Sequence, residues 1–344
     1  MALRVGLVGG GSVARVHLAA YANIREVAAV RVAETNVAAH DAIGQLPKVA
    51  AVVADTRSLL DDPGLDLIDI CLPHHLHAPT AIAALQAGKA VICEKPIATT
   101  LEDADAMIAA AEAASRPLYI SHNMRFYPHH IRTRELLDQG AIGKPFLAII
   151  NVIGNEFGRM NDPAHWKGTW DKAGGGATID TGFHATYTLM SWFGGPTAVT
   201  AVMARHVVTA ANKADDNAAV IFEFPGLLAN LAITYTATAH PWDERREVHG
   251  TAGSLYINDR TPPRLRLVKG DGNSPVAIDE LANPFGDSIA AAIRHFVGCY
   301  LTGQEPMVTA AESRAVLRVA LAVYQSAREG RRIELCKEHE GIGG

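Results

Sequence analysis

Three consecutive glycines, Gly9 to Gly11, follow directly on the apolar segment that opens the chain. A strand that runs straight into such a turn and then into a helix is typical of a dinucleotide-binding βαβ unit. Up to residue 122, apolar segments alternate with alanine-rich amphipathic ones, which predicts a parallel, doubly wound sheet. The expected strands are Arg4–Val8, Val27–Val32, Leu67–Leu72, Ala90–Cys93 and Leu118–Ser121, and the expected helices include Pro79–Ala87 and Glu102–Ala114.

The small residues of the glycine turn each have a physical reason in a dinucleotide site. Gly9 permits the tight bend, Gly11 lets the backbone approach a pyrophosphate, and Ala14 keeps the following helix close to the strand. The helix start at Ser12 and Val13 then offers its N–H groups to the phosphates. A plain strand-to-helix turn is the alternative, because such glycine clusters also occur without a nucleotide.

The second expected strand ends at Glu34. At this place in a βαβ unit an acidic side chain accepts hydrogen bonds from the hydroxyls of the adenosine ribose. A phosphate on that ribose would face the carboxylate at close range, and neither Thr35 nor Asn36 adds a positive charge. We therefore expect NAD in preference to NADP; the alternative is a solvated glutamate at a strand end.

The pattern changes after residue 122. A helix is expected at Pro128–Gln139 and another at Ala310–Glu329, and between them glycine-bearing turns separate β-rich stretches, which predicts a large, mainly antiparallel open sheet. We expect an α/β chain with a NAD-binding Rossmann domain at residues 1–122 and a substrate-binding and oligomerisation α+β domain at 123–344. The expected strands of the second domain are Phe146–Ile153, Val199–Val208, Ala218–Phe224, Leu228–Thr236, Val248–Ile257 and Arg264–Val268.

Composition and charge argue against several classes of function. The formal net charge is −5 and there is no dense Lys/Arg run, so the chain lacks the electrostatic footprint of a protein that binds nucleic acid or an anionic membrane. No segment is apolar for long enough to span a bilayer, and the first residues lack the apolar core of a secretion signal. Cys71 and Cys93 lie in apolar, strand-like segments, where cysteine acts as a small hydrophobe. We expect a cytoplasmic protein with a small-molecule ligand.

The tripeptide Glu94-Lys95-Pro96 closes an apolar strand and places a lysine where that strand leaves the sheet. In open α/β folds the chemistry gathers at this edge. We expect Glu94 and Lys95 to lie at the cofactor, and Pro96 to stiffen the loop that carries them.

A histidine-rich segment follows the neighbouring strand. Leu72, Pro73, His74 and His77 should face the cofactor crevice, because they leave the sheet at the same edge. Histidines at this spacing can chelate a metal, but no cysteine or carboxylate cluster supplies further ligands, so we expect no metal site.

Several segments together resemble the Gfo/Idh/MocA family of oxidoreductases, in the expected order from residue 4 to about residue 335. The resemblance implies a Rossmann domain followed by an open-sheet α/β domain, a nicotinamide cofactor, and oxidation of a secondary alcohol of a sugar, glycoside or cyclitol, or the reverse. Family members often carry asparagine where His74 stands, which affects the local cofactor contact. The segments are Gly6–Ala14 with His17, Leu72–His77, Ala87–Pro96, His122–Phe126 and Gly174–His184.

The resemblance implies a catalytic set of Lys95, Asp180 and His184. Alcohol oxidation needs a base for the hydroxyl proton, and histidine titrates near neutral pH, so His184 is the candidate base. Asp180 lies four residues earlier, so on a helix both side chains project from one face, and the pair can hold the imidazole tautomer. Lys95 would stabilise the developing alkoxide and relay a proton. The alternatives are a surface pair of Lys95 with Glu94 and a core position for His184.

A further group of residues is expected on the substrate side, because an aromatic ring beside a cation suits the apolar face and hydroxyl rim of a sugar. The alternative for the tryptophans is a place in the domain core. The expected substrate contacts, beside the catalytic set, are Arg125, Tyr127, His165, Trp166 and Lys167.

Two functions remain open beside the NAD-dependent dehydrogenase. Some related sequences use NAD to cleave glycosides through transient oxidation and elimination, and the Glu-Lys-Pro motif fits both reactions. A non-catalytic nucleotide-binding sensor is the other, and the presence of Lys95, Asp180 and His184 together argues against it. The resemblance also points to a homodimer or homotetramer.

Overall fold

The computed structural model describes residues 2–206, 214–270 and 272–335, and the chain forms two compact units. The first unit contains residues 1–126 and 281–317, and the second contains 127–280 and the chain from 318 onward. The sequence-based expectation was of two domains, each continuous in the chain, that meet at residue 122. The first unit of the structure also includes residues 281–317.

The first unit is built on a six-stranded parallel sheet with the order β3-β2-β1-β4-β5-β6. This order reverses direction beside β1, as in doubly wound folds that bind nucleotides at the carboxyl edge. The predicted parallel Rossmann sheet is therefore confirmed. Its strands are β1 (Leu3–Val8), β2 (Val27–Ala33), β3 (Val49–Val53), β4 (Leu67–Ile70), β5 (Ala90–Glu94) and β6 (Leu118–Ser121).

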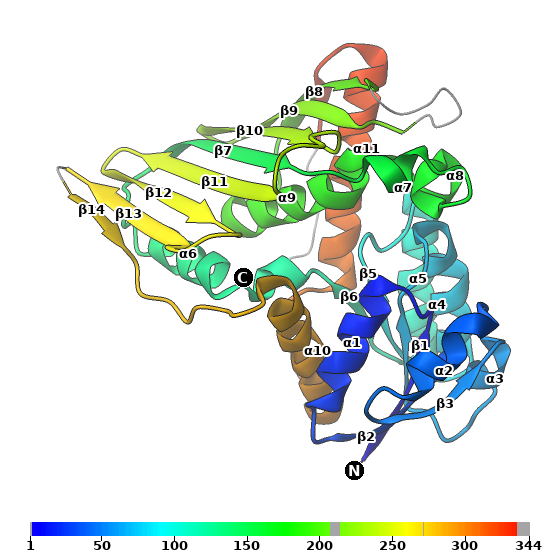
Figure 1. Cartoon of the computed structure of the whole chain (residues 1–344). Coiled ribbons are helices and arrows are strands. Elements are labelled where there is room, and N and C mark those ends of the chain that lie inside the picture. Colours follow the sequence, from blue (N-terminus) through cyan, green and yellow to red (C-terminus); the bar gives the residue numbers. More distant parts are fainter. Residues whose placement is uncertain (1, 207–213, 271, 336–344) are drawn as a thin grey trace. The chain divides into compact units, whose positions relative to one another are not determined.

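Helices cover both faces of this sheet (Figure 1). α1 (Ser12–Ala22) packs beside α10 (Pro284–Thr302), and the ring of Phe296 on α10 stacks on Tyr119 of β6 with 5.2 Å between centroids. α4 (His77–Gln86) and α5 (Leu101–Ala114) pack against each other. The remaining helices are η1 (Val37–Ala39), α2 (His40–Gly44), α3 (Arg57–Leu60), η2 (His74–Leu76), η3 (Asn123–Phe126) and the first part of α11 (Ala310–Glu329).

The second unit is built on a nine-stranded sheet with the order β14-β13-β12-β11-β7-β10-β9-β8-β15. Among the described residues of this sheet, only the β7–β10 pair is parallel, so the prediction of a mainly antiparallel sheet is confirmed. Its strands are β7 (Pro145–Ile153), β8 (Ala198–Ala204), β9 (Asn217–Phe224), β10 (Leu227–Thr234), β11 (Asp243–Gly250), β12 (Gly253–Asn258), β13 (Leu265–Lys269), β14 (Gly272–Pro275) and β15 (Ile333–Glu334).

One face of this sheet carries the core of the unit. α6 (Pro128–Asp138), α9 (Ala177–Phe193) and the second part of α11 contribute to that core, and buried and exposed residues alternate along β10 as expected for a half-covered sheet. The ribbon in Figure 1 shows α6 and α9 lying along the same side of the sheet. The remaining helices of the unit are α7 (Phe157–Asn161), η4 (Trp166–Gly168) and α8 (Trp170–Ala173).

Several elements differ from the sequence-based expectation. The single strand expected at Val248–Ile257 is a hairpin, because β11 ends at Gly250 and β12 begins at Gly253. β3 and α10 were not foreseen. The strand expected at Val199–Val208 corresponds to β8, and the last two residues of that range lie outside the described residues.

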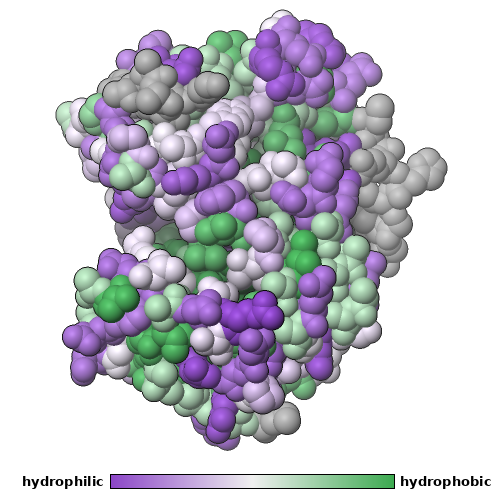
Figure 2. All heavy atoms as spheres, turned by 90° about the vertical axis from the view of Figure 1, so that its right-hand side faces the viewer, coloured by the Kyte–Doolittle hydropathy of each residue, from purple (hydrophilic) through white to green (hydrophobic). Residues whose placement is uncertain are grey.

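On the face drawn in Figure 2, hydrophilic and hydrophobic residues are interspersed. Within the described part of the chain, no helix combines the length and the apolarity that a membrane span requires.

Candidate active site

The glycine turn that connects β1 to α1 depends on two of its glycines for different reasons. Gly9 has φ +99°, and a Cβ there would collide with the carbonyl oxygen of Cys71, so only glycine fits. Gly11 is the N-cap of α1, and a Cβ on it would meet nothing within 4 Å. No side chain caps the helix start at Ser12 and Val13. The turn therefore has the open space and the uncapped helix start that a pyrophosphate requires.

The carboxylate of Glu34 lies against this turn. Its Oε2 accepts a hydrogen bond from the Gly10 N–H at 2.6 Å, and its Oε1 accepts one from the Asn36 N–H at 2.6 Å. A Cβ on Gly10 would lie 2.7 Å from that Oε2. Gly10, which sequence reasoning left without a role, thus makes room for the acidic side chain beside the turn.

Lys95 directly follows β5, with 9% of its surface exposed, and the Lys95–Pro96 bond is cis. The buried ring of His77 contacts the loop that contains Lys95 and Pro96. Its Nδ1 is 2.8 Å from the Pro96 carbonyl oxygen and its Nε2 is 2.9 Å from the Leu72 carbonyl oxygen. Burial lowers the pKa of His77, and the neutral ring donates to one of the two carbonyls. His77 therefore lies between the loops after β4 and β5 and donates a hydrogen bond to the backbone of one of them.

Glu94 and His74 lie at the same edge but face the interior. Oε1 of Glu94 is 3.1 Å from Nε2 of the buried His17, and the His17 charge offsets the effect of burial and lowers the pKa of Glu94. His74 is buried in η2, with its ring centroid 5.7 Å from that of His77. Pro73 is the N-cap of η2. Glu94 thus contacts the buried His17, and His74 lies beside the buried His77. Their contacts with a cofactor stay predictions.

In the second unit, Asp180 lies in the first turn of α9, where Lys167 and Tyr235 contact its carboxylate. Lys167 Nζ lies 2.6 Å from its Oδ2, and the hydroxyl of Tyr235 donates to the same oxygen at 2.9 Å. Burial lowers the pKa of Lys167, but Asp180 and Glu156 offset this effect and raise it. The carboxylate therefore lies beside an ammonium group. Sequence reasoning missed Tyr235, whose only signal was a tyrosine at the end of an expected strand.

His184 lies one turn further along α9, with 8% of its surface exposed. Its Nδ1 is 2.6 Å from the hydroxyl oxygen of Tyr187, three residues ahead on the same helix. The sequence suggested that Asp180 holds the tautomer of this ring, and that role stays a prediction. The hydroxyl of Tyr187 is the partner described at Nδ1. With Nδ1–H donated to Tyr187, Nε2 keeps its lone pair for a proton.

The start of α9 is fixed by two residues from distant parts of the second unit. The carboxylate of Asp215 accepts hydrogen bonds from the N–H groups of Gly176 and Thr178, both at 2.9 Å, and from the Thr178 hydroxyl at 2.6 Å. The Tyr324 hydroxyl donates to Asp215 at 2.7 Å. A Cβ on Gly176 would collide with the Asp215 backbone, and one on Gly175 with the Tyr324 hydroxyl. These glycines therefore let a carboxylate cap the helix that carries Asp180.

The expected substrate contacts divide into three places. His165, Trp166 and Lys167 gather next to Asp180: the first two rings stack with centroids 5.8 Å apart, and Lys167 Nζ lies 5.7 Å from the Trp166 ring. Arg125 belongs to the first unit, where its Nη2 lies 3.5 Å from the Met307 carbonyl oxygen. Tyr127 is buried in the second unit and does not join the group at Asp180 in the contacts described.

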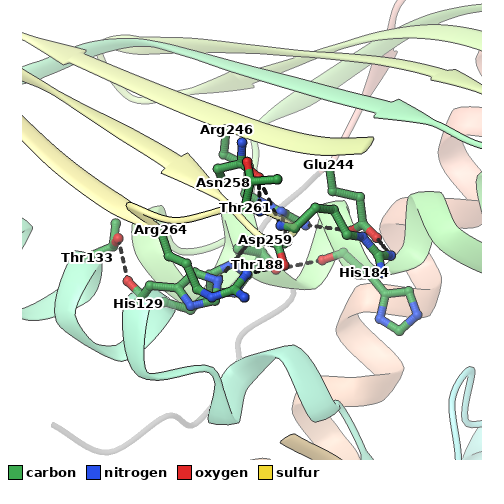
Figure 3. A network of polar contacts seen from close by, with 12 residues as sticks. His129, Thr133, His184, Thr188, Glu244, Arg246, Asn258, Asp259, Thr261 and Arg264 are labelled. Atoms are coloured by element: carbon green, nitrogen blue, oxygen red, sulfur yellow. Dashed lines mark hydrogen bonds and ion pairs between the residues drawn. The ribbon is translucent and has the colours of Figure 1, made fainter. Parts of the chain in front are cut away.

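Tyr127 instead packs against a buried charged network that sequence reasoning did not foresee. Figure 3 shows His129, Arg246 and Asp259 of this network. The ring of Tyr127 stacks on His129, with centroids 4.9 Å apart. His129 and His130 each place Nε2 2.9 Å from Oδ1 of Asp259, while Arg246 pairs with Oδ2. Two histidines and a carboxylate can chelate a metal, but here a cation would meet the guanidinium of Arg246. The network joins α6, β11 and the residue after β12.

Comparison with known proteins decides the family. Residues 3–122 match the NAD-binding Rossmann fold of the Gfo/Idh/MocA oxidoreductase family, and residues 130–256 match the GFO/IDH/MocA C-terminal domain. The chain is a member of the Gfo/Idh/MocA family. The resemblance seen in the sequence is thereby confirmed, and the chain is an oxidoreductase with a domain for a nicotinamide cofactor.

The Gfo/Idh/MocA relatives of this chain act on sugars and cyclitols. The chain is 27% identical over 340 residues to inositol 2-dehydrogenase of Rhizobium meliloti, covering 97% of this chain and all of the relative. It is 29% identical over 309 residues to levoglucosan dehydrogenase of Pseudarthrobacter phenanthrenivorans, covering 77% of this chain and 76% of the relative. Among solved structures, levoglucosan dehydrogenase in complex with NADH matches with a TM-score of 0.90 at 25% identity, over 98% of this chain and all of that one.

A second solved structure, the aldose-aldose oxidoreductase of Caulobacter crescentus complexed with glycerol, matches with a TM-score of 0.84 at 28% identity. It covers 97% of this chain and 100% of its own. These Gfo/Idh/MocA proteins act on different sugars and cyclitols. The family match therefore gives the class of reaction but does not identify the substrate of this chain.

Proposed function

We propose that this chain is an NAD-dependent dehydrogenase that oxidises a secondary hydroxyl of a sugar, glycoside or cyclitol, or runs the reverse reduction. The observation that carries the proposal is the arrangement along α9. Asp180 is oriented by Lys167 and Tyr235, and His184 is oriented by Tyr187, so one helix presents a carboxylate and an imidazole whose orientations are both fixed.

In the proposed reaction, His184 Nε2 takes the hydroxyl proton of the substrate, and the Nδ1–H donated to Tyr187 keeps the ring in the tautomer that a base requires. Asp180 accepts a hydrogen bond from a substrate hydroxyl and sets its orientation. Lys95 donates to the oxygen that gains negative charge. A bound nicotinamide supplies the hydride acceptor. The group of His165, Trp166 and Lys167 suits the apolar face and hydroxyl rim of a ring.

The residues of the first unit support NAD in preference to NADP. Gly9, Gly11 and the uncapped start of α1 fit a pyrophosphate, and the Glu34 carboxylate beside the turn suits two ribose hydroxyls. A ribose phosphate would be repelled by this charge. Replacing Glu34 with serine should narrow the preference for NAD over NADP in kcat/KM, and an unchanged ratio would refute the assignment.

The proposed reaction is tested by NADH formation at 340 nm with inositols, free sugars and glycosides. With a substrate in hand, Lys95→Ala and His184→Ala should lower kcat by roughly two to four orders of magnitude and leave NAD affinity within a few-fold. Full activity of either variant would remove that residue from the mechanism. Consumption of a glycoside without net NADH would identify the cleaving reaction instead.

The exposed face of the nine-stranded sheet supports self-association. Val202 is 70% exposed, Leu228 53% and Ile221 47%, and strand register places them on the same face of β8, β10 and β9. Monomeric proteins seldom leave such apolar side chains grouped on a flat sheet. We propose that this face associates with a second copy of the chain to give a homodimer or homotetramer.

A further inference from the structure

One buried histidine of the first unit has no part in the chemistry proposed above. His17 lies on α1, with 0% of its side chain exposed. Its Nδ1 is 2.8 Å from Oδ2 of Asp69 in the middle of β4, and its Nε2 is 3.1 Å from Oε1 of Glu94, the last residue of β5. A fully buried polar ring with a carboxylate on each nitrogen is a costly arrangement unless both contacts are made.

The contacts continue in both directions from His17. The hydroxyl of Tyr21, one turn further along α1, donates to the same Asp69 oxygen at 2.8 Å. At the other end, Oε2 of Glu94 accepts a hydrogen bond from the backbone N–H of Lys95 at 3.3 Å. A chain of contacts therefore runs from the helix that follows the glycine turn to the peptide group of Lys95.

The charges favour a protonated His17. Burial lowers the pKa of His17, but the Asp69 carboxylate more than offsets burial and raises the pKa well above 6.5. As an imidazolium, the ring donates from both nitrogens, one to each carboxylate. A neutral ring would have one N–H for two carboxylates and would leave one of the two contacts unmade.

We propose that His17 is a positioning residue that, by donating to Asp69 and Glu94 together, fixes the Glu94 carboxylate and through it the backbone of Lys95. This rests on the proposed role of Lys95 in catalysis. It would make the orientation of the catalytic lysine depend on α1, whose first turn is the expected phosphate site. Misplacement of a reacting group by about 1 Å is enough to cost about a hundredfold in rate.

The test compares His17→Asn with His17→Gln. The asparagine amide reaches the place of Nδ1 and can still meet Asp69, whereas the glutamine amide reaches the place of Nε2 and can still meet Glu94. Both variants lose the charge, and only the second keeps the contact toward Lys95. We expect kcat to fall at least about tenfold in His17→Asn and much less in His17→Gln, with NAD affinity unchanged within a few-fold in both.

A second measurement does not need a substrate. Amine-reactive labelling followed by peptide mass spectrometry reports how accessible each lysine is. Lys89 precedes the same strand at its other end, is 6% exposed, and donates to the Asp62 and Leu65 carbonyls at 2.6 and 2.8 Å, so it is an internal control. In His17→Asn, Lys95 should label several-fold faster while Lys89 does not change.

Three results would overturn the inference: wild-type labelling of Lys95 in His17→Asn, equal loss of kcat in both variants, or faster labelling of both lysines together, which would indicate general loosening of the unit. If no sugar or cyclitol is turned over, the proposed function fails. The labelling comparison still decides whether His17 positions Lys95.

Discussion

A neighbouring hydroxyl lies against the imidazole ring of His184. Tyr187 approaches Nδ1 at 2.6 Å from within the same helix, so the spacing of the two residues along α9 sets the geometry. The sequence predicts that Asp180 and His184 project from one face of a helix and act as a pair, and this pairing stays a prediction. Sequence reasoning overlooked the partners that the structure supplies, Tyr187 for the imidazole and Lys167 for the carboxylate.

Tyr187→Phe removes the acceptor of the Nδ1–H and leaves the ring otherwise in place. We expect kcat for the proposed oxidation to fall about tenfold, because the base loses its fixed tautomer, while NAD affinity stays the same. Steady-state kinetics and an NADH binding titration measure the two effects. Tyr256→Phe on β12 is the control and should be fully active; an equally active Tyr187→Phe enzyme would show that the tautomer is set elsewhere.

A pH dependence follows from His130. Burial, only partly offset by Asp259, lowers its pKa to about 4, so this histidine stays neutral in the folded chain while the unfolded chain binds a proton below about pH 6.5. The unfolded state then carries more protons between pH 6.5 and 4, so stability must fall as pH falls through this window, by up to about 3 kcal/mol for this residue.

Urea unfolding at several pH values between 4.5 and 7.5 tests this expectation. His130→Gln keeps a donor toward Asp259 but does not titrate, so its stability should fall less steeply with acid than that of the wild type. His240→Gln, at an exposed position, is the control and should keep the wild-type slope. Identical slopes for all three proteins would contradict the assignment.

At the scale of elements, the hydrogen bonds that cap the start of α9 come from residues outside the helix. Its N-cap, Gly176, has no side chain, and the cap is supplied by Asp215 with Tyr324 behind it. The glycine run was recognised in the sequence as a motif. The reason for the glycines could not be predicted, because Asp215 is 39 residues from Gly176 and no local pattern marks it as the cap.

Asp215→Asn keeps the shape of the cap but removes its charge and one of its two acceptor oxygens. We expect the free energy of unfolding to fall by about 2 kcal/mol, since a charge-assisted cap with several N–H partners is lost. Urea unfolding measures this. The control is Asp138→Asn, an exposed carboxylate paired with Arg134 at 2.8 Å, which should change stability by less than about 0.5 kcal/mol.

The elements that the sequence predicted well are those with a strong local pattern. β1, β4, β5 and β6 are short apolar runs bounded by glycine, proline or charge, and they were found within a few residues. β3 was missed although it is a short apolar run. α10 was missed although Pro284 and Gly303 are typical start and stop signals of a helix. That α10 joins the first unit could not be predicted, because its partners lie far away in the sequence. The hairpin of β11 and β12 was missed because Thr251 and Ala252 are weak turn signals.

At the scale of the whole molecule, the proposed self-association makes a direct prediction. Leu228→Glu places a charge on the exposed apolar face of the nine-stranded sheet and should shift the chain toward the monomer, because a buried unpaired charge at an interface is costly. Light scattering after size-exclusion chromatography measures the mass. Val37→Glu, at a 66% exposed position of the first unit, should keep the wild-type mass; a monomeric wild type would remove the proposal.

The return of α10 to the first unit has a consequence for how the protein is made. The six strands are complete at Ser121, but Ile293 and Phe296, which belong to the same core, are translated only much later. At typical rates of synthesis this delay is roughly 10 to 35 s. For that interval α1 covers part of the sheet face against which α10 packs, and the apolar surface that α10 buries stays exposed. We therefore expect the nascent chain to bind a chaperone until α10 emerges.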